Sequence, residues 1–315
     1  MILIDQAEVR ARLTYELCIP TVAQAMKALS AGDTRQLLRG IIPLAEGRMF
    51  GVMPGAMGER EAFGAKLISV FPENFAKGIQ SHQGVVVLFD PDTGAVACVA
   101  HAGEVTAIRT AAASAVATDA LARPQASRLA ILGYGEQAET HLRAIRHVRP
   151  IATVTVWGRS PERAERFADH MSAETGLEVR AAPDARAAIA GADIICTVTS
   201  AAEPVLFGDW IAPGTHINLV GSSHAGPTEV DHELVVRSRF IADSRASVLA
   251  AGAEFLKAKA AGLIDDDHIA GEIGEVLLGR VAGRRSADEI TVYKSLGHIV
   301  QDLASVRALM ALTAA

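Results

Sequence analysis

Residues 128–138 have the sequence RLAILGYGEQA, in which an apolar run leads directly into a glycine-rich turn. The turn matches the pattern G-x-G-x-x-A and continues into a stretch with helical periodicity. Gly133 would permit a tight turn, Gly135 would let the backbone approach a pyrophosphate, and Ala138 is small enough for a helix to pack on a strand. Free N–H groups at the start of such a helix favour phosphate, so the stretch predicts a dinucleotide-binding strand, turn and helix. The cofactor-binding candidates in this turn are Gly133, Gly135, Glu136, Gln137 and Ala138.

The sequence that follows this turn alternates between short apolar runs and helix-length polar or alanine-rich stretches. Such alternation is typical of a doubly wound parallel α/β sheet with helices on both faces, the Rossmann architecture. From about residue 245 onward we expect helices. The six expected strands cover residues 128–132, 153–157, 178–181, 193–198, 216–220 and 239–242.

The first hundred residues have a different pattern, typical of an antiparallel sheet with helices, an α+β arrangement. Helices are expected over residues 5–32, where Pro20 would open the second of two helices and Gly32 would end it. A further helix, rich in alanine, is expected over residues 104–122. The five expected strands cover residues 37–43, 48–54, 63–70, 84–89 and 95–100.

Composition restricts the class of protein. A chain of 315 residues is long for one core and suits two domains. A net charge of −6 argues against a nucleic-acid surface, which needs a basic face. The three cysteines, Cys18, Cys98 and Cys196, have neither metal-ligand spacing nor a disulfide framework, so a reducing cytoplasm is expected. No apolar run is long enough to span a membrane, and we expect no bound metal.

The residues after the second expected strand bear on the choice of cofactor. NAD-binding proteins usually place an acidic residue there, where it accepts hydrogen bonds from ribose hydroxyls. Residues 156–160 read VWGRS and contain no acid. Arg159 and Ser160 could instead hold a 2′-phosphate, which favours NADP(H) over NAD(H) while leaving NAD(H) open. The alternative is that Arg159 is only a solvated residue at a helix start.

Several motifs outside the turn point to one family. They are GAKL at 64–67, FPEN at 71–74, TAIRTAA at 106–112, GEIG at 271–274 and EITVYKSLG at 289–297. With the dinucleotide turn, these motifs resemble those of the ornithine cyclodeaminase/mu-crystallin family over essentially the whole chain.

The resemblance implies a homodimer in which each chain has two domains. A substrate-binding and dimerisation domain would comprise residues 1–114 with 298–315, and a Rossmann domain for the nicotinamide cofactor would comprise residues 115–297. Members include ornithine cyclodeaminase, ketimine and pyrroline-2-carboxylate reductases, an alanine dehydrogenase and the binding protein mu-crystallin. The enzymes move hydride at the α-carbon of an amino or imino acid, which is the chemistry expected here.

Arg39, Lys66 and Arg109 form a basic set in the first expected domain. In an acidic protein, a site for a small carboxylate needs local positive charge, and arginine offers a bidentate fork. The resemblance implies that all three hold the substrate carboxylate and that Lys66 also exchanges a proton with the reacting nitrogen. A desolvated lysine near two arginines would have a lowered pKa, which suits that task near neutrality. The alternative for each is an ordinary surface charge.

The loop after the fifth expected Rossmann strand departs from the cyclodeaminases. The resemblance places Ser223 where those enzymes carry a catalytic aspartate. A neutral serine cannot act as a base at pH 7, whereas reduction of a cyclic imine does not require that base. Ser223 or His224 could hydrogen-bond the ring nitrogen or relay a proton, although His224 could equally be a loop residue without a role. Asp231 is expected to cap the next helix.

Three further cofactor-binding candidates lie later in the chain: Thr199, Lys294 and Ser295. The last two belong to a family motif near the nicotinamide, with helix capping as the alternative for Ser295. Asp302 is expected to be an ordinary surface or interface charge.

Three functions remain open on the sequence. The favoured one is an NADPH-dependent reductase of a small cyclic imino acid such as 1-pyrroline-2-carboxylate. The second is an ornithine cyclodeaminase or an amino-acid dehydrogenase. The third is a nicotinamide-binding protein without turnover, which the retention of all three basic residues disfavours.

Overall fold

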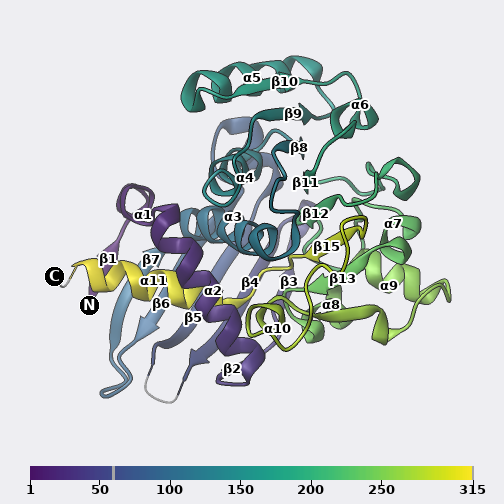
Figure 1. The fold of residues 1–315 in the computed structure, drawn as a ribbon. Coiled ribbons are helices and arrows are strands. Elements are labelled where there is room, and N and C mark those ends of the chain that lie inside the picture. Colours follow the sequence, from purple (N-terminus) through teal and green to yellow (C-terminus); the bar gives the residue numbers. More distant parts are fainter. Residues whose placement is uncertain (59–60, 314–315) are drawn as a thin grey trace. The chain divides into compact units, whose positions relative to one another are not determined.

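The computed structural model describes residues 1–58 and 61–313 (Figure 1). The chain divides into two compact units, Met1–Ala113 with His298–Ala315, called the N-terminal unit below, and Ser114–Gly297, called the central unit. The N-terminal unit is therefore discontinuous in sequence and includes the segment from His298 onward. None of the helices in the described ranges combines the length and apolar character that crossing a membrane requires.

In the described part of the N-terminal unit, seven strands form one mainly antiparallel sheet. Its order is β1-β7-β6-β5-β4-β2, and β3 pairs with β4 beside β2. Among the described strands of this sheet, the only parallel pair is β1 with β7. The antiparallel pattern expected from the sequence is confirmed. The strands are β1 (Ile2–Ile4), β2 (Thr34–Gln36), β3 (Gly40–Pro43), β4 (Met49–Met57), β5 (Phe63–Val70), β6 (His82–Phe89) and β7 (Val96–His101).

Helices cover this sheet. The long helices α2 (Tyr15–Ala31) and α11 (Ile299–Thr313) come from opposite ends of the chain and pack on each other, and α11 also lies on β4, β5 and β6 (Figure 1, purple and yellow). The expected helix start at Pro20 is wrong, because Thr14 caps the backbone N–H of Leu17 and α2 begins at Tyr15. Pro20 lies inside the helix, and the buried apolar face of α2 offsets the missing hydrogen bond. The other helices of the unit are α1 (Gln6–Arg12) and the first part of α3 (Ala102–Leu121), with 3₁₀ turns at Ala45–Gly47 and Pro72–Lys77.

Eight parallel strands form the sheet of the central unit, residues 114–297, all of which the structure describes. Its order is β10-β9-β8-β11-β12-β15-β13-β14, and the chain reverses its direction of winding between β8 and β11. The doubly wound fold class is confirmed. The strands are β8 (Arg128–Leu132), β9 (Thr153–Trp157), β10 (Glu178–Ala181), β11 (Ile194–Thr197), β12 (His216–Leu219), β13 (Arg239–Ala242), β14 (Ile269–Glu272) and β15 (Thr291–Lys294).

Two of these strands were not expected. The sequence after residue 245 was predicted to be helical, but it contains β14 and β15, and β15 lies between β12 and β13. All four residues of β15 are buried. A four-residue run that is buried on both faces has no alternation of apolar and polar residues, so periodicity cannot distinguish it from a helix.

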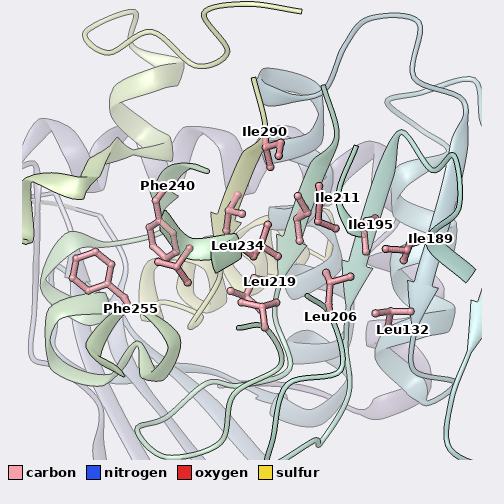
Figure 2. Close-up of a cluster of buried hydrophobic side chains, with 14 of the residues drawn as sticks. Leu132, Ile189, Ile195, Leu206, Ile211, Leu219, Leu234, Phe240, Phe255 and Ile290 are labelled. Atoms are coloured by element: carbon pink, nitrogen blue, oxygen red, sulfur yellow. The ribbon is translucent and has the colours of Figure 1, made fainter. Parts of the chain in front are cut away.

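A core of small and branched apolar side chains holds the sheet of the central unit to its helices (Figure 2). Leu132, Ile195 and Leu219 come from neighbouring strands, while Leu234 and Phe255 come from helices. This core fixes the positions at which the strands end, and ligands of doubly wound folds bind at the carboxyl ends of the strands. The helices are α4 (Glu136–Ile145), α5 (Pro161–Thr175), α6 (Ala185–Ile189), α7 (His232–Arg237), α8 (Arg245–Ala251), α9 (Ala253–Ala260) and α10 (Ile273–Leu277), with 3₁₀ turns at Gly208–Trp210 and Asp266–His268.

Candidate active site

A buried group of charges lies on the face of the N-terminal sheet that α11 covers. Lys66 on β5 and Arg109 on α3 are 2% and 3% exposed, and Asp302 on α11 is fully buried. The Nζ of Lys66 donates to both carboxylate oxygens of Asp302 at 2.9 and 3.0 Å. The Nε of Arg109 donates to one of them at 3.1 Å. We call Lys66, Arg109, Gln301 and Asp302 the Lys66 cluster.

The alternation of β5 explains why Lys66 is buried. Lys66 and Ile68 point to the covered face of the sheet, whereas Leu67 points to the opposite face and is 36% exposed. Because α11 packs on β5, a side chain on that helix can reach Lys66. Gln301 and Asp302 are consecutive on α11, and Gln301 Oε1 accepts a hydrogen bond from Arg109 Nη1 at 2.8 Å.

Burial controls the protonation of Lys66. The pKa of the ammonium is lowered to about 7: burial is the main cause, Asp302 opposes it, and Arg109 and Arg39 add to the lowering. The lowering expected from the sequence is confirmed. A lysine with a pKa near neutrality can both give and take a proton at physiological pH.

Arg39 acts on the same group of charges. It is half-buried in the segment between β2 and β3, and its charge lowers the pKa of Lys66. Two histidines also adjoin the cluster, His82 on β6 and His298 just before α11. Burial is the main cause that lowers the pKa of each to about 4, so both are neutral at pH 7. Of the three basic residues singled out in the sequence, Arg39 and Arg109 therefore act electrostatically on Lys66.

The expectation for Asp302 was wrong, because this carboxylate is buried and paired with two cations. Burial would raise the pKa of Asp302, but Arg109 and Lys66 outweigh burial and hold the pKa below its ordinary value. A signal was present in the sequence: Asp302 is the only acidic residue in the apolar stretch 299–313. A carboxylate in such an apolar helix is seldom buried unless it is paired.

The dinucleotide turn has the expected local geometry. Gly133 follows β8 with φ of 123°, and a Cβ there would lie 2.7 Å from the carbonyl oxygen of Val198. Gly135 is the N-cap of α4 and has no side chain to cap the helix start, where the backbone favours an anion. Ala138 is fully buried against the sheet. The turn stands where the strand order reverses, which is the usual dinucleotide site of this architecture.

Two buried oxygens fit a bound dinucleotide. The Oε1 of Gln137 on α4 and the Oγ of Ser295 just after β15 have no hydrogen-bond partner in the described part of the chain. Both residues were cofactor-binding candidates. Buried polar atoms normally have a partner, so these two orphans, together with the uncapped start of α4, fit a ligand with its own donors and acceptors.

The segment after β9 contains the residues considered for a 2′-phosphate. Arg159 is exposed, and its guanidinium has no partner among the residues that the structure describes. Ser160 is the N-cap of α5, where its Oγ accepts from the backbone N–H of Arg163 and donates to Glu162. Gly158 lies under the ring of Tyr134, and a Cβ there would come 2.1 Å from a ring carbon.

A second buried group of charges lies at the carboxyl ends of β11, β12 and β15. The ammonium of Lys294 donates to Ser222 O and Oγ, each at 2.6 Å, and pairs with Glu254 at 2.9 Å. The Oγ of Ser222 donates to Glu254. We call Ser222, Glu229, Glu254 and Lys294 the Glu229 cluster.

Glu229 ties two strand ends together. Its carboxylate accepts from Thr197 Oγ1 at 2.8 Å, from Thr199 N and Oγ1 at 2.6 and 2.7 Å, and from Gly221 N at 2.6 Å. Thr197 ends β11, and Gly221 follows β12. Glu229, Glu254 and Ser222 were missed, because only the fold brings residues so distant in sequence to one place.

The remaining candidates fall around the Glu229 cluster. Thr199 and Lys294 belong to it or bond to it, and all three protons of the Lys294 ammonium are used inside the protein. Ser223 and His224 are half-buried in the loop that follows β12. Asp231 caps α7 through Leu234 N, as expected. The catalytic and cofactor-binding roles of these residues stay predictions.

These features define a class: a protein with a Rossmann-type unit and a separate α+β unit that buries a lysine of near-neutral pKa. The chain belongs to the ornithine cyclodeaminase/mu-crystallin family, whose model matches residues 1–311. The family membership inferred from the motifs is thereby confirmed.

Relatives of known activity match nearly the whole chain. It is 37% identical to ketimine reductase mu-crystallin of Mus musculus over 295 residues, 92% of this chain and 90% of the relative. It is 34% identical to the Delta(1)-pyrroline-2-carboxylate reductase of Bacillus thuringiensis subsp. konkukian, with coverage of 96% and 94%. Among solved structures, the Delta(1)-pyrroline-2-carboxylate reductase of Thermococcus litoralis in complex with NADH and L-proline superposes with a TM-score of 0.95 at 35% identity, covering 99% of this chain and 97% of that one.

Proposed function

We propose that the chain is an NAD(P)H-dependent reductase of a cyclic imino acid of the 1-pyrroline-2-carboxylate type, which it converts to the cyclic amino acid. The observation that carries this proposal is the buried ammonium of Lys66, with a pKa of about 7, beside two arginines. Relatives that reduce such imines over nearly the same length support it.

The N-terminal unit provides charge and a proton. The guanidinium groups of Arg39 and Arg109 attract the substrate carboxylate, and burial strengthens that attraction. Lys66 donates a proton from Nζ to the ring nitrogen, so that the carbon of the C=N bond becomes more electrophilic. A reduced nicotinamide bound at the Gly133–Gly135 turn would supply the hydride that this carbon accepts. One proton and one hydride together turn the imine into the amine.

The loop after β12 distinguishes reduction from deamination. A cyclodeaminase needs a carboxylate base, and the only acids in residues 220–231 are Glu229 and Asp231. Glu229 accepts four hydrogen bonds from the protein, and Asp231 caps α7. We propose that Ser223 or His224 hydrogen-bonds the ring nitrogen. This loop supports the reductase over the lyase.

For the cofactor we propose binding at the Gly133–Gly135 turn, with NADP(H) preferred. The exposed, unpartnered Arg159 supports the preference, since a guanidinium suits a 2′-phosphate. The relative from Thermococcus litoralis holds NADH, so both nucleotides must be compared. Arg159→Ala should weaken NADPH binding about tenfold and NADH binding less than twofold. Titration of cofactor fluorescence measures both, and equal losses would remove the argument for the phosphate.

We also propose that two copies associate through the face of the N-terminal sheet opposite Lys66. Leu67 points to that face and lies in register with Val52 and Val85, which are half-buried. Ile42 on β3 pairs with Phe50, points to the same face and is exposed as well. Apolar side chains in this number on a sheet face suit an interface between identical chains. Light scattering coupled to gel filtration tests it, and a monomer at micromolar concentration would refute it.

A direct assay tests the activity. The protein, with NADPH or NADH, is mixed with 1-pyrroline-2-carboxylate or its six-membered homologue, and the absorbance of the reduced cofactor is followed. We expect consumption. Ammonia release from ornithine with NAD, without imine reduction, would replace the proposal with a cyclodeaminase. Tight NADPH binding without turnover on any of these substrates would replace it with a nicotinamide-binding protein.

A further inference from the structure

The C-terminal helix α11 contributes a buried carboxylate to a lysine that lies 236 residues away in sequence. We infer that Asp302 is a positioning residue for the reaction: it holds Lys66 and Arg109 in place and keeps the Lys66 ammonium charged until it gives its proton to the substrate. This inference rests on the proposed function for the identity of the proton acceptor.

Asp302 and its neighbour orient both cations. One carboxylate oxygen of Asp302 accepts from Lys66 and from Arg109, and the other accepts from Lys66 alone. Gln301 accepts from Nη1 of Arg109, so this guanidinium is held at two of its nitrogens. Nη2 donates to none of the residues that the structure describes, which leaves donors for an anion. One turn of α11 thus fixes two side chains that come from other elements.

The hydrogen-bond acceptors of the Lys66 ammonium support the same role for Asp302. Two of its three donors go to Asp302, and the third makes only a long contact, 3.4 Å, with Thr106 Oγ1. A weak neutral acceptor is easily replaced by a substrate atom, whereas a carboxylate at 2.9 Å is not. Asp302 therefore anchors the ammonium while one proton stays available.

Among the charged and titratable groups that act on Lys66, only Asp302 favours its protonated form. Arg109 from α3 and Arg39 from the β2–β3 segment oppose protonation. His82 from β6 and His298 before α11 are neutral at pH 7, because burial lowers the pKa of each to about 4. Loss of the Asp302 charge should thus move the titration of Lys66 to lower pH.

The charge balance argues against a purely structural ion pair. Lys66 and Arg109 carry two positive charges against one negative charge on Asp302. A buried cluster with an excess of cations is unfavourable by itself, because each unpaired charge keeps its desolvation penalty. A bound carboxylate would complete the balance. The surplus therefore indicates a site that is prepared for an anionic ligand.

The test is Asp302→Asn, which keeps the shape of the side chain and removes its charge. Since protonated Lys66 is the proposed acid, kcat/KM should fall as pH rises through about 7. In the variant this fall should begin at least about one pH unit lower, which means about a tenfold loss near pH 8 and little loss near pH 6. The titration of the imine itself is common to both proteins and cancels. A folded variant whose profile keeps its position would overturn the inference.

The matched control is Glu104→Gln. Glu104 is also a buried carboxylate of the N-terminal unit and lies on α3 with Arg109, but its partners are Gln6, Arg10 and Gln80. The pH profile of this variant should stay that of the unaltered protein. A shift equal to that of Asp302→Asn would show that any buried carboxylate of this unit has the same effect, which contradicts a specific role for Asp302.

A binding measurement separates this inference from the proposed function. Pyrrole-2-carboxylate is a planar carboxylate that the enzyme is not expected to reduce, and its affinity can be measured by calorimetry from about pH 5 to about pH 9. Its affinity should weaken above the pKa of Lys66, and Asp302→Asn should move that weakening to lower pH. A moved binding curve without turnover on any imine would leave the role of Asp302 intact and refute the reductase. An unmoved curve in an active enzyme would do the reverse.

A measurement on the unaltered protein keeps the inference testable if Asp302→Asn does not fold. The ¹³C shift of the Asp302 carboxyl should show a step near pH 7, when its partner Lys66 loses the proton. The carboxyl of Glu104, which has no contact with Lys66, should show none there. Absence of the step at Asp302 would overturn the inference.

Discussion

The two units bury charge in opposite proportions. The Lys66 cluster sets two cations against one carboxylate, and the Glu229 cluster sets one cation, Lys294, against the carboxylates of Glu229 and Glu254. In the Glu229 cluster the excess of negative charge is met by backbone N–H groups and hydroxyls. In the Lys66 cluster the two cations have, besides Asp302, only Gln301 Oε1 and a long contact with Thr106 Oγ1 as acceptors among the described residues, and none of these lies against Nη2 of Arg109.

This difference indicates two kinds of buried charge. A carboxylate saturated with donors fixes the backbone around it, as Glu229 does for the ends of β11 and β12. A cation without a full complement of acceptors is suited to an anionic ligand and has a pKa that the ligand and its neighbours can change. We therefore expect substitutions in the Lys66 cluster to change turnover and its pH dependence, and substitutions in the Glu229 cluster to change stability and cofactor binding.

The largest expected effect is that of Lys66→Met. It removes the proposed acid and one of the cations that attract the carboxylate, while Asp302 keeps Arg109 as its partner. General acid catalysis alone contributes about 10²–10⁴-fold, so kcat/KM should fall about 10³-fold. The affinity for NAD(P)H should change less than twofold, as fluorescence titration measures. Lys77→Met, at an exposed lysine of the same unit, is the control and should be silent. A large loss of cofactor affinity in Lys66→Met would contradict the division of roles between the units.

Glu229→Gln should have the next largest effect, on stability and cofactor binding. The amide group must place N–H donors against Thr199 N, Gly221 N or their neighbours, which already donate. Because the amide N–H group and a backbone N–H group would then face each other without an acceptor, the free energy of unfolding should fall by about 2–3 kcal/mol and cofactor binding should weaken. Chemical denaturation measures the first effect. The control is Glu233→Gln on α7, an exposed residue paired only with Arg237 among the described residues. If Glu229→Gln shifted the pH profile of kcat/KM and left stability unchanged, the distinction between the clusters would fail.

The sequence was sufficient for features that depend on local chemistry. Four Rossmann strands, including β8 and β9, have the predicted bounds, because each lies between helix or turn signals in the alternating pattern of the sequence. The turn at Gly133 was recognised because its glycines have separate steric reasons. The capping role of Asp231 followed from its place before a helix.

Features that depend on long-range contacts were not predicted. Asp302 looks like a surface acid until α11 is placed on β5, and only the fold shows that it meets Lys66. Likewise β15 is too short to have a period, and its buried position between β12 and β13 follows from pairing. In the loop after β12 the sequence predicted a role for Ser223, whereas the neighbouring Ser222 is the residue that is buried and bonded to Lys294.

The smallest expected effect is the contribution of Lys66 to the pH dependence of stability. The pKa of Lys66 is about 7 in the folded chain and about 10.4 in an unfolded one. Between these values the unfolded chain binds a proton that the folded chain does not, so the free energy of unfolding contributed by Lys66 rises with pH, by at most about 1.4 kcal/mol per pH unit. Below pH 7 Lys66 is charged in both states, and this contribution no longer changes.

Urea denaturation between about pH 7 and pH 9 measures this contribution as a difference between the unaltered protein and Lys66→Met. The difference removes the titrations common to both proteins. The unaltered protein should gain stability relative to the variant by about 1 kcal/mol per pH unit, and Glu233→Gln should follow the unaltered protein. Parallel curves for the unaltered protein and Lys66→Met would mean that Lys66 stays charged when folded, and then neither the proton transfer nor the role of Asp302 could stand.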